Sequence, residues 1–290
     1  MKVLLIGLGQ IGLGLIVPVF QKAGYELVGT DANVERLNQL RNGYVLKTPG
    51  ANFELNVDVR TMDEVDGQFD LVITSVGRQH LDKVADWLEL KNISAPVLLA
   101  ENLPDPVNLF KNQIPIIVDR ICPRVEMRDG VLTAIAEDYF KIVILDGALT
   151  RPLGKVKGVE LENNEKDLEV KRKQKMFMVN TAHLIAALYG QKKGLMFVEE
   201  AVAEPEISSI IEATLSEIGQ WLGFDAKETA VRTQGILKRL ASPLKDPLSR
   251  ILNLDKKLSS LRYVEVPLKG IRSSGKKVPV LEGVYKVLTA

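Results

Sequence analysis

The chain has 290 residues, of which 46% are hydrophobic and 26% are charged, and 38 Lys and Arg balance 37 Asp and Glu. This composition is typical of a globular protein and excludes a disordered or fibrous chain. The one cysteine, Cys122, excludes an internal disulfide and indicates a cytoplasmic protein, and with only two histidines we expect no bound metal. The net charge of +1 and the 6% of aromatic residues argue against a nucleic-acid partner.

The N-terminal segment contains no charged residue from Val3 to Gln21. A signal peptide or a membrane span would also be uncharged, but this segment holds four glycines and a proline. Those residues favour a strand, a turn and a helix over one continuous apolar helix. We therefore expect neither a leader nor a membrane partner.

Short apolar runs alternate with amphipathic stretches through the first 165 residues, which is typical of βαβ units and a parallel sheet. The predicted helices include residues 34–41 and 80–90. The predicted strands are residues 2–6, 27–30, 71–74, 96–100, 114–119, 131–135 and 141–145, the last two pairing as a hairpin-like extension. The fold class is therefore α/β, with a Rossmann-type NAD-binding domain over residues 1–165.

Helical patterns dominate residues 166–290. Asn164 and Asp167 have the spacing of a capping box, and Gly190 is a typical helix stop. Further helical patterns occupy residues 204–222, 226–240 and 246–261. With 21 basic and 14 acidic residues, this predicted helical domain suits a small anionic substrate.

The turn after the first predicted strand is Gly7-Leu8-Gly9-Gln10-Ile11-Gly12, a G-x-G-x-x-G motif, and Asp31 follows the second strand. Glycines in such a turn allow a tight bend, close approach of a pyrophosphate and close helix–strand packing. The acid would bind the adenosine ribose diol and repel a 2′-phosphate, which favours NAD over NADP. We assign cofactor binding to Gly7, Gly9, Gln10, Ile11, Gly12 and Asp31, and contact with the nicotinamide half to Val76 and Gly77, although a plain strand-end turn explains the last two equally well.

Lys175, Asn180 and His183 interrupt an apolar helical pattern over residues 176–189. On an α-helix with about 100° per residue, Asn180 lies roughly 140° and His183 roughly 80° from Lys175, so the three share one broad face. Buried polar groups without partners are costly, which favours a functional site on this face. A solvated lysine at a helix start and a hydrogen-bonded core histidine explain the pattern equally well.

The spacing Lys175-x4-Asn180-x2-His183 resembles the active-site helix of the polyol-specific long-chain dehydrogenases, the mannitol dehydrogenase family. Other segments that resemble this family are residues 7–14, 30–33, Glu101-Asn102-Leu103, Val118-Asp119-Arg120-Ile121 and residues 154–161. The resemblance implies an NAD-dependent oxidoreductase that acts on CH–OH groups without a metal.

Roles for individual residues also follow from the resemblance. Lys175 would be the general base, Asn180 and Asn102 would bind the alkoxide or carbonyl oxygen, and His183 would bind a substrate hydroxyl. Such an active site would lie between the two predicted domains. Asp119 and Arg120 would orient these groups or the substrate, although a structural ion pair explains them equally well.

The substrate is expected to be a sugar alcohol phosphate, with mannitol 1-phosphate and its keto-sugar fructose 6-phosphate as the first candidates. Phosphate-using members of the family carry a basic stretch, and basic residues remain here in an altered form of it. We assign substrate contacts to these residues, Arg250, Lys256, Lys257 and Arg262, although a solvated helix face would also explain each of them. The alternatives are a non-phosphorylated polyol, a sugar acid of the mannonate or altronate type, and a non-catalytic NAD sensor. A β-hydroxyacid dehydrogenase would space its lysine and asparagine by x3 rather than x4.

Overall fold

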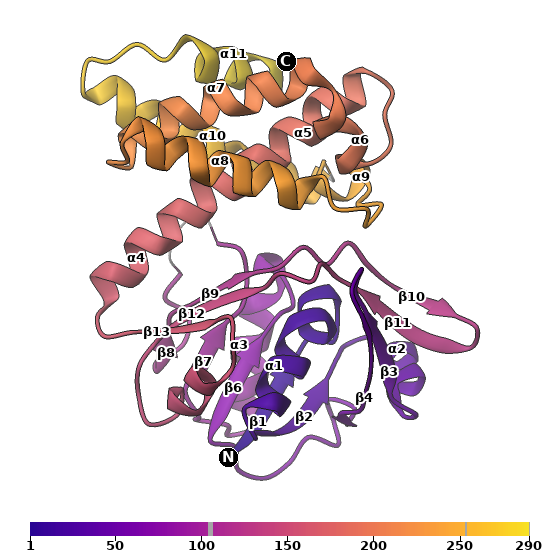
Figure 1. Ribbon diagram of the computed structural model, residues 1–290. Helices are drawn as coiled ribbons and strands as arrows, with labels where there is room; N and C mark the ends of the chain where they lie inside the picture. Colours follow the sequence, from indigo (N-terminus) through magenta and orange to yellow (C-terminus); the bar gives the residue numbers. More distant parts are fainter. Residues whose placement is uncertain (104–106, 253, 290) are drawn as a thin grey trace. The chain divides into compact units, whose positions relative to one another are not determined.

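The protein divides into two compact units, Met1–Glu169 and Val170–Ala290 (Figure 1). Their structure is a computed structural model that describes residues 1–103, 107–252 and 254–289, without the side chains of residues 254–260. Helix α4 (Glu165–Gln174) runs across the boundary between the units. As predicted for its capping box, the Asp167 N–H donates to Asn164 Oδ1 at 2.9 Å.

A six-stranded parallel sheet forms the centre of the first unit, with strand order β5-β2-β1-β6-β7-β8. This arrangement confirms the predicted Rossmann-type fold class. The strands are β1 (Lys2–Ile6), β2 (Glu26–Thr30), β5 (Asp58–Val59), β6 (Leu71–Thr74), β7 (Val97–Leu99) and β8 (Gln113–Ile114).

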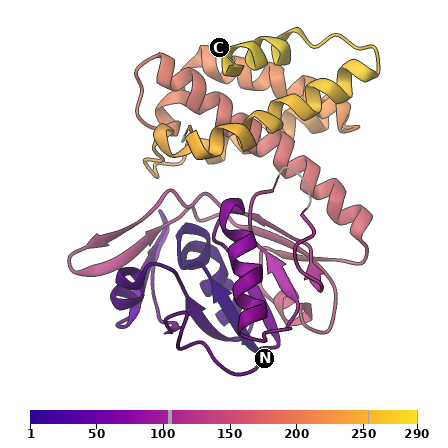
Figure 2. The same ribbon diagram turned by 180° about the vertical axis from the view of Figure 1, so that it is seen from behind.

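Helices cover both faces of this sheet. Successive side chains of a strand point to opposite faces, and in β1 the side chains from Val3 to Ile6 are apolar and buried on both faces. Val3 and Leu5 of β1 belong to one core with η1 (Gly12–Ile16) and α1 (Val17–Lys22). Leu4 and Ile6 belong to a second core with α3 (Leu81–Leu90), which Figure 2 shows in front of the sheet. The remaining helical segments of this unit are α2 (Val34–Leu40), η2 (Arg78–His80) and η3 (Arg151–Lys155).

Two smaller sheets complete the first unit, with strand orders β10-β11-β3-β4 and β13-β12-β9. Their strands are β3 (Tyr44–Lys47), β4 (Asn52–Leu55), β9 (Ile116–Asp119), β10 (Arg124–Arg128), β11 (Val131–Ile135), β12 (Lys141–Leu145) and β13 (Val159–Glu162). The predicted pairing of residues 131–135 with 141–145 is wrong, because β11 and β12 lie in different sheets.

Local turn chemistry explains these differences. Asp129 and Gly130 have φ of 49° and 77°, which suits a two-residue hairpin turn, so β11 pairs with β10 instead. The predicted strand 114–119 is divided between β8 and β9, which belong to different sheets. Pro115, which has no N–H to donate to a sheet, lies between them.

The second unit is helical, as predicted. Segment η4 (Lys175–Val179) leads from α4 into α5 (Asn180–Lys192), a buried helix that contacts α6, α7, α9 and α10. The other helices are α6 (Val198–Ala203), α7 (Pro205–Trp221), α8 (Ala226–Leu240), α9 (Leu248–Ile251), α10 (Leu254–Ser273) and α11 (Pro279–Thr289). The predicted helix over residues 246–261 is instead two helices, α9 and α10. Within the described residues, none of the helices is long and apolar enough to cross a membrane.

Candidate active site

The glycine-rich turn follows β1 in the first unit, and its three motif glycines differ in the space around them. Gly7 has φ of 100°, and a Cβ there would lie 2.6 Å from the Ser75 carbonyl oxygen. A Cβ on Gly12 would lie 2.2 Å from the Gly7 carbonyl oxygen. Gly9 differs, because no protein atom lies within 4 Å of its Cβ position. Close packing therefore explains Gly7 and Gly12, whereas Gly9 leaves open space beside the turn for a ligand.

Asp31 lies at the carboxyl end of β2, next to this turn. Its carboxylate accepts the Leu8 N–H at 2.7 Å and the Asn33 N–H at 2.9 Å. The first bond ties the acid directly to the glycine-rich turn. An acid held in this position, beside a turn with space at its second glycine, fits the adenosine ribose and pyrophosphate of a nicotinamide dinucleotide.

The helix after the turn contains a π-helical segment, η1, and two of its carbonyl groups accept hydrogen bonds from side chains. The Leu13 carbonyl accepts the Tyr44 hydroxyl at 2.7 Å, and the Gly14 carbonyl accepts Arg120 Nη1 at 2.5 Å. Arg120 also donates from Nε and Nη2 to the Glu137 carbonyl, at 2.9 and 2.7 Å. These bonds hold the guanidinium of Arg120 on the backbone of the first unit.

Other predicted residues of the first unit have these places. The Gln10 side chain donates to the Pro123 carbonyl at 2.7 Å. Ile11 precedes η1 as its N-terminal flanking residue. Asp119 is buried at the end of β9, and Asn102 is exposed in the loop after β7.

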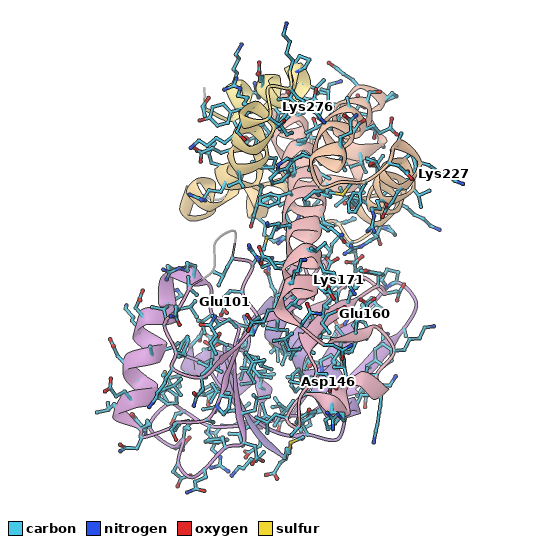
Figure 3. The ribbon with its side chains drawn as sticks, turned by 90° about the vertical axis from the view of Figure 1, so that its left-hand side faces the viewer. Glu101, Asp146, Glu160, Lys171, Lys227 and Lys276 are labelled. Carbon is cyan, nitrogen blue, oxygen red and sulfur yellow. The ribbon has the colours of Figure 1, made fainter. Side chains whose placement is uncertain are left out.

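Glu101, which is labelled in Figure 3, is the neighbour of Asn102 and joins the loop after β7 to the end of β6. Its carboxylate accepts the Thr74 hydroxyl at 2.8 Å and the Val76 N–H at 3.0 Å. Burial raises the pKa of the Glu101 carboxyl, and these two hydrogen bonds offset part of that effect. The predicted nicotinamide turn at Val76 and Gly77 is therefore held to the loop that carries Asn102. No role was predicted for Glu101 from the sequence, although it precedes Asn102 in the family-like motif.

In the second unit, Lys175 begins the π-helical segment η4 and is buried. The Asn180 N–H donates to the Lys175 carbonyl, which closes a turn from residue i to residue i+5. The estimate of 140° between Lys175 and Asn180 assumed an α-helix and is therefore wrong. Lys175 and Asn180 lie one π-turn apart, and π-turns inside α-helices are frequent at functional sites.

The Asn180 side chain extends from the first residue of α5. Its amide nitrogen lies 3.1 Å from Met176 Sδ. Burial raises the pKa of Tyr263 on α10, and the nearby Asn180 side chain offsets part of that effect. The hydroxyl therefore keeps its proton at neutral pH.

His183, one turn further along α5, is paired with Asp246, a residue that the sequence analysis did not select. His183 Nε2 lies 2.9 Å from Asp246 Oδ2, and Arg250 donates to the same carboxylate at 2.7 and 2.6 Å. Burial opposes ionisation of Asp246, but the bonds from His183 and Arg250 outweigh it and hold its pKa well below the usual range. Asp246 is thus a buried anion that orients one histidine and one arginine.

The predicted basic residues are in different situations. Arg250 is bound to Asp246, and Arg262 is half-buried on α10. The side chains of Lys256 and Lys257 lie outside the described part of the structure. In the part that is described, no three His, Cys, Asp or Glu side chains gather in a way that would hold a metal ion.

Two sets of site residues result, one in each unit. The first comprises the glycine-rich turn, Asp31, and the loop of Glu101 and Asn102. The second comprises Lys175, Asn180 and His183, with Asp246 as the partner of His183. Asp246 could have been suspected from the pair Asp246-x3-Arg250, which has helical ion-pair spacing.

Comparison with known proteins gives consistent relatives. A model of the mannitol dehydrogenase C-terminal domain matches residues 167–277. The chain is 29% identical to mannitol-1-phosphate 5-dehydrogenase of Bacillus pumilus, with 87% of this chain and 78% of the relative covered. It is 28% identical to a protein of the same name from an Exiguobacterium species, with 87% and 75% covered.

Solved structures share the fold at low identity. Pseudomonas fluorescens mannitol 2-dehydrogenase, in a ternary complex with NAD and D-mannitol, has a TM-score of 0.79 over 99% of this chain and 78% of its own, at 13% identity. A ketopantoate reductase from Ralstonia eutropha has a TM-score of 0.67 over 100% and 97%, at 17% identity. Both likenesses show that this chain shares the fold of these two proteins.

Proposed function

We propose that the chain is a member of the mannitol dehydrogenase family and that it interconverts a sugar alcohol and its keto-sugar with NAD as cofactor. Mannitol 1-phosphate and fructose 6-phosphate are the first candidates, since two curated relatives are named for the former. The observation that carries the proposal is the π-turn that sets Lys175 one turn from Asn180, on the helix where Asp246 orients His183.

The cofactor would be held by residues of the first unit. Backbone N–H groups of the glycine-rich turn would bind the pyrophosphate in the space beside Gly9. The Asp31 carboxylate would accept bonds from the ribose diol, and its charge would disfavour the 2′-phosphate of NADP. Val76 and Gly77 would contact the nicotinamide half. When bound, NAD accepts the hydride that the carbinol carbon loses.

Lys175 is the proposed general base. In polyol oxidation its neutral Nζ takes the proton of the reacting hydroxyl, and in ketose reduction the ammonium returns that proton. Burial of the side chain excludes water that would otherwise compete for the same proton.

Asn180 and Asn102 are proposed to bind the oxygen on which negative charge develops. Two amide N–H donors aimed at one oxygen stabilise an alkoxide more than the neutral hydroxyl. His183 has its Nε2 on Asp246, and we assign its Nδ1 to a hydroxyl of the substrate. The substrate chain would then be fixed on both sides of the reacting carbon.

A non-phosphorylated polyol or a sugar acid is the second candidate, and the state of Arg250 favours it. Both Nε and Nη2 of Arg250 are bound to Asp246, so this edge of the guanidinium is not offered to a phosphate. A phosphate would have to be bound by other groups.

A steady-state screen tests these candidates. NADH oxidation is measured with fructose 6-phosphate, fructose and several uronates. Turnover of fructose 6-phosphate at least about tenfold above that of fructose supports the phosphorylated substrate, and the reverse order supports the second candidate. Binding of NADH without turnover of any of these substrates contradicts the proposal that the protein is an enzyme and supports a non-catalytic NAD sensor.

A further inference from the structure

Four hydrogen bonds close a ring of four residues at the glycine-rich turn. The Asp31 carboxylate accepts the N–H of Leu8 at 2.7 Å and the N–H of Asn33 at 2.9 Å. The Asn33 side chain accepts the N–H of Arg36 at 3.0 Å, and Arg36 Nη1 donates to the Leu8 carbonyl at 3.4 Å. The ring therefore holds a carboxylate on the N–H of Leu8 and a guanidinium on its C=O, immediately before Gly9.

The guanidinium of Arg36 is weakly held within this ring. Its bond to Leu8 is longer than the usual upper value of about 3.2 Å for such bonds. Its Nε is buried without a hydrogen-bond partner, and Arg36 forms no ion pair, among the residues that the structure describes. A guanidinium carries five N–H groups in a planar fork that suits a phosphate. The described residues thus leave most of the donor capacity of Arg36 unused.

The ring lies where the proposed function puts the adenosine ribose of the cofactor. Asp31 is the residue assigned to the ribose diol, and the space beside Gly9 is assigned to the pyrophosphate. In NADP the 2′ oxygen of this ribose carries a phosphate. An acid at the end of the second strand disfavours that phosphate, whereas an arginine nearby accommodates it. Asp31 and Arg36 therefore have opposite effects on the same position of the cofactor.

We propose that Arg36 is a ligand for the 2′-phosphate of NADP, and that the charge of Asp31 prevents it from acting in the wild type. The carboxylate would contact the ribose oxygens directly, so its repulsion of the phosphate outweighs the attraction of the guanidinium. Without that carboxylate, Arg36 leaves its long bond to Leu8 and forms charge-assisted hydrogen bonds with the phosphate. This inference rests on the proposed function, because it places the ribose of the cofactor at Asp31.

Two substitutions of Asp31 release Arg36. Asp31→Ser removes the charge, and Asp31→Asn removes it while keeping an oxygen that can accept the Leu8 N–H, in case the serine variant does not fold. Each is made alone, with Arg36→Ala and with Arg41→Ala. Arg41 is an exposed residue at the other end of the same helix, α2, and serves as the matched control. The Kd values for NADPH and NADH are measured on the full-length protein by fluorescence titration, which needs no turnover.

We expect each Asp31 variant to bind NADPH at least about tenfold more tightly than the wild type. Adding Arg36→Ala should remove most of this gain, because a hydrogen bond to a charged group contributes about tenfold to a hundredfold in affinity. Adding Arg41→Ala should change the Kd for NADPH by less than about twofold. NADH has no 2′-phosphate, so Arg36→Ala should leave the Kd for NADH within about threefold in every background.

Several results would overturn the proposal. One is an equal gain in NADPH affinity with and without Arg36, and another is an equal loss in the Arg36→Ala and Arg41→Ala variants. A third is that neither Asp31 variant gains affinity for NADPH. If the wild type binds NADH but Arg36 has no effect on NADPH binding, this inference alone fails. If the wild type binds neither dinucleotide, the proposed function fails and this inference fails with it.

Discussion

Replacing Asp246 with asparagine removes the charge from the cluster of His183, Asp246 and Arg250 and leaves the side-chain shape almost unchanged. The Asp246 side chain is 4% exposed and that of Arg250 is 24% exposed. Removing one partner from a buried ion pair costs about 3–5 kcal/mol. Because water compensates part of the charge of Arg250, we expect the second unit to lose about 2–3 kcal/mol at neutral pH. The melting temperature should fall by roughly 8–12 °C for a unit of this size.

The effect should depend on pH in a defined direction. The pKa of Asp246 is lowered in the folded protein. Its contribution to stability is therefore fully present above the pKa of an unfolded aspartate, about 3.9. It is lost as the pH falls below that value towards the folded pKa. The difference in melting temperature between wild type and Asp246→Asn should be constant near neutral pH and should shrink below about pH 4.

The chain offers a matched control in Glu228→Gln. Glu228 and Arg232 are also four residues apart in the second unit, but their side chains are 43% and 40% exposed. An exposed pair of this kind contributes about 0.5 kcal/mol or less. Scanning calorimetry of both variants at pH 7 and at pH 3.5 compares them directly. If Asp246→Asn costs no more stability than Glu228→Gln, the reasoning from burial is refuted.

Three other substitutions test the proposed site. Lys175→Ala should lower turnover in both directions by at least about a hundredfold, while NADH still binds. In the wild type, the rate of polyol oxidation should rise with pH and the rate of ketose reduction should fall. Near-normal turnover of Lys175→Ala would remove Lys175 from the mechanism. Asp31→Ser should narrow the preference for NAD over NADP in kcat/KM, and a wild-type protein that already prefers NADP would contradict the assigned role. Gly9→Val should leave the melting temperature unchanged and weaken NADH binding at least about tenfold. Gly12→Ala should lower the melting temperature, because only the added methyl group at residue 12 would meet protein atoms. Equal NADH affinity in wild type and Gly9→Val would argue against a ligand beside the turn.

The parallel sheet and the glycine-rich turn were predictable because their determinants are local. Short apolar runs identify β1, which a glycine follows, and β2, and the spacing from Gly12 to Asp31 fits one βαβ unit. The smaller sheets were less accessible. The pairing of β11 with β3 joins segments more than 80 residues apart, and no local pattern encodes such a partner. Only the turn at Asp129 and Gly130 was readable in advance.

The candidate site shows the same limit. Lys175, Asn180 and His183 could be selected because three polar residues interrupt an apolar helix. Their mutual geometry could not be predicted, because an angle of 100° per residue holds only for an unbroken α-helix. Asp246 was missed because its contact with His183 spans 63 residues and comes from a short segment before α9.

The π-turn at Lys175 also bears on how this chain compares with other dehydrogenases in an alignment. A turn closed from residue i to residue i+5 holds one residue more than an α-helical turn. A lysine and an asparagine separated by x4 across a π-turn are therefore one turn apart, as are the same residues separated by x3 across an α-turn. One inserted residue, absorbed as a bulge, interconverts the two spacings and leaves both groups in place. An aligned pair of such sequences would show a gap inside a helix, where the structures themselves superpose.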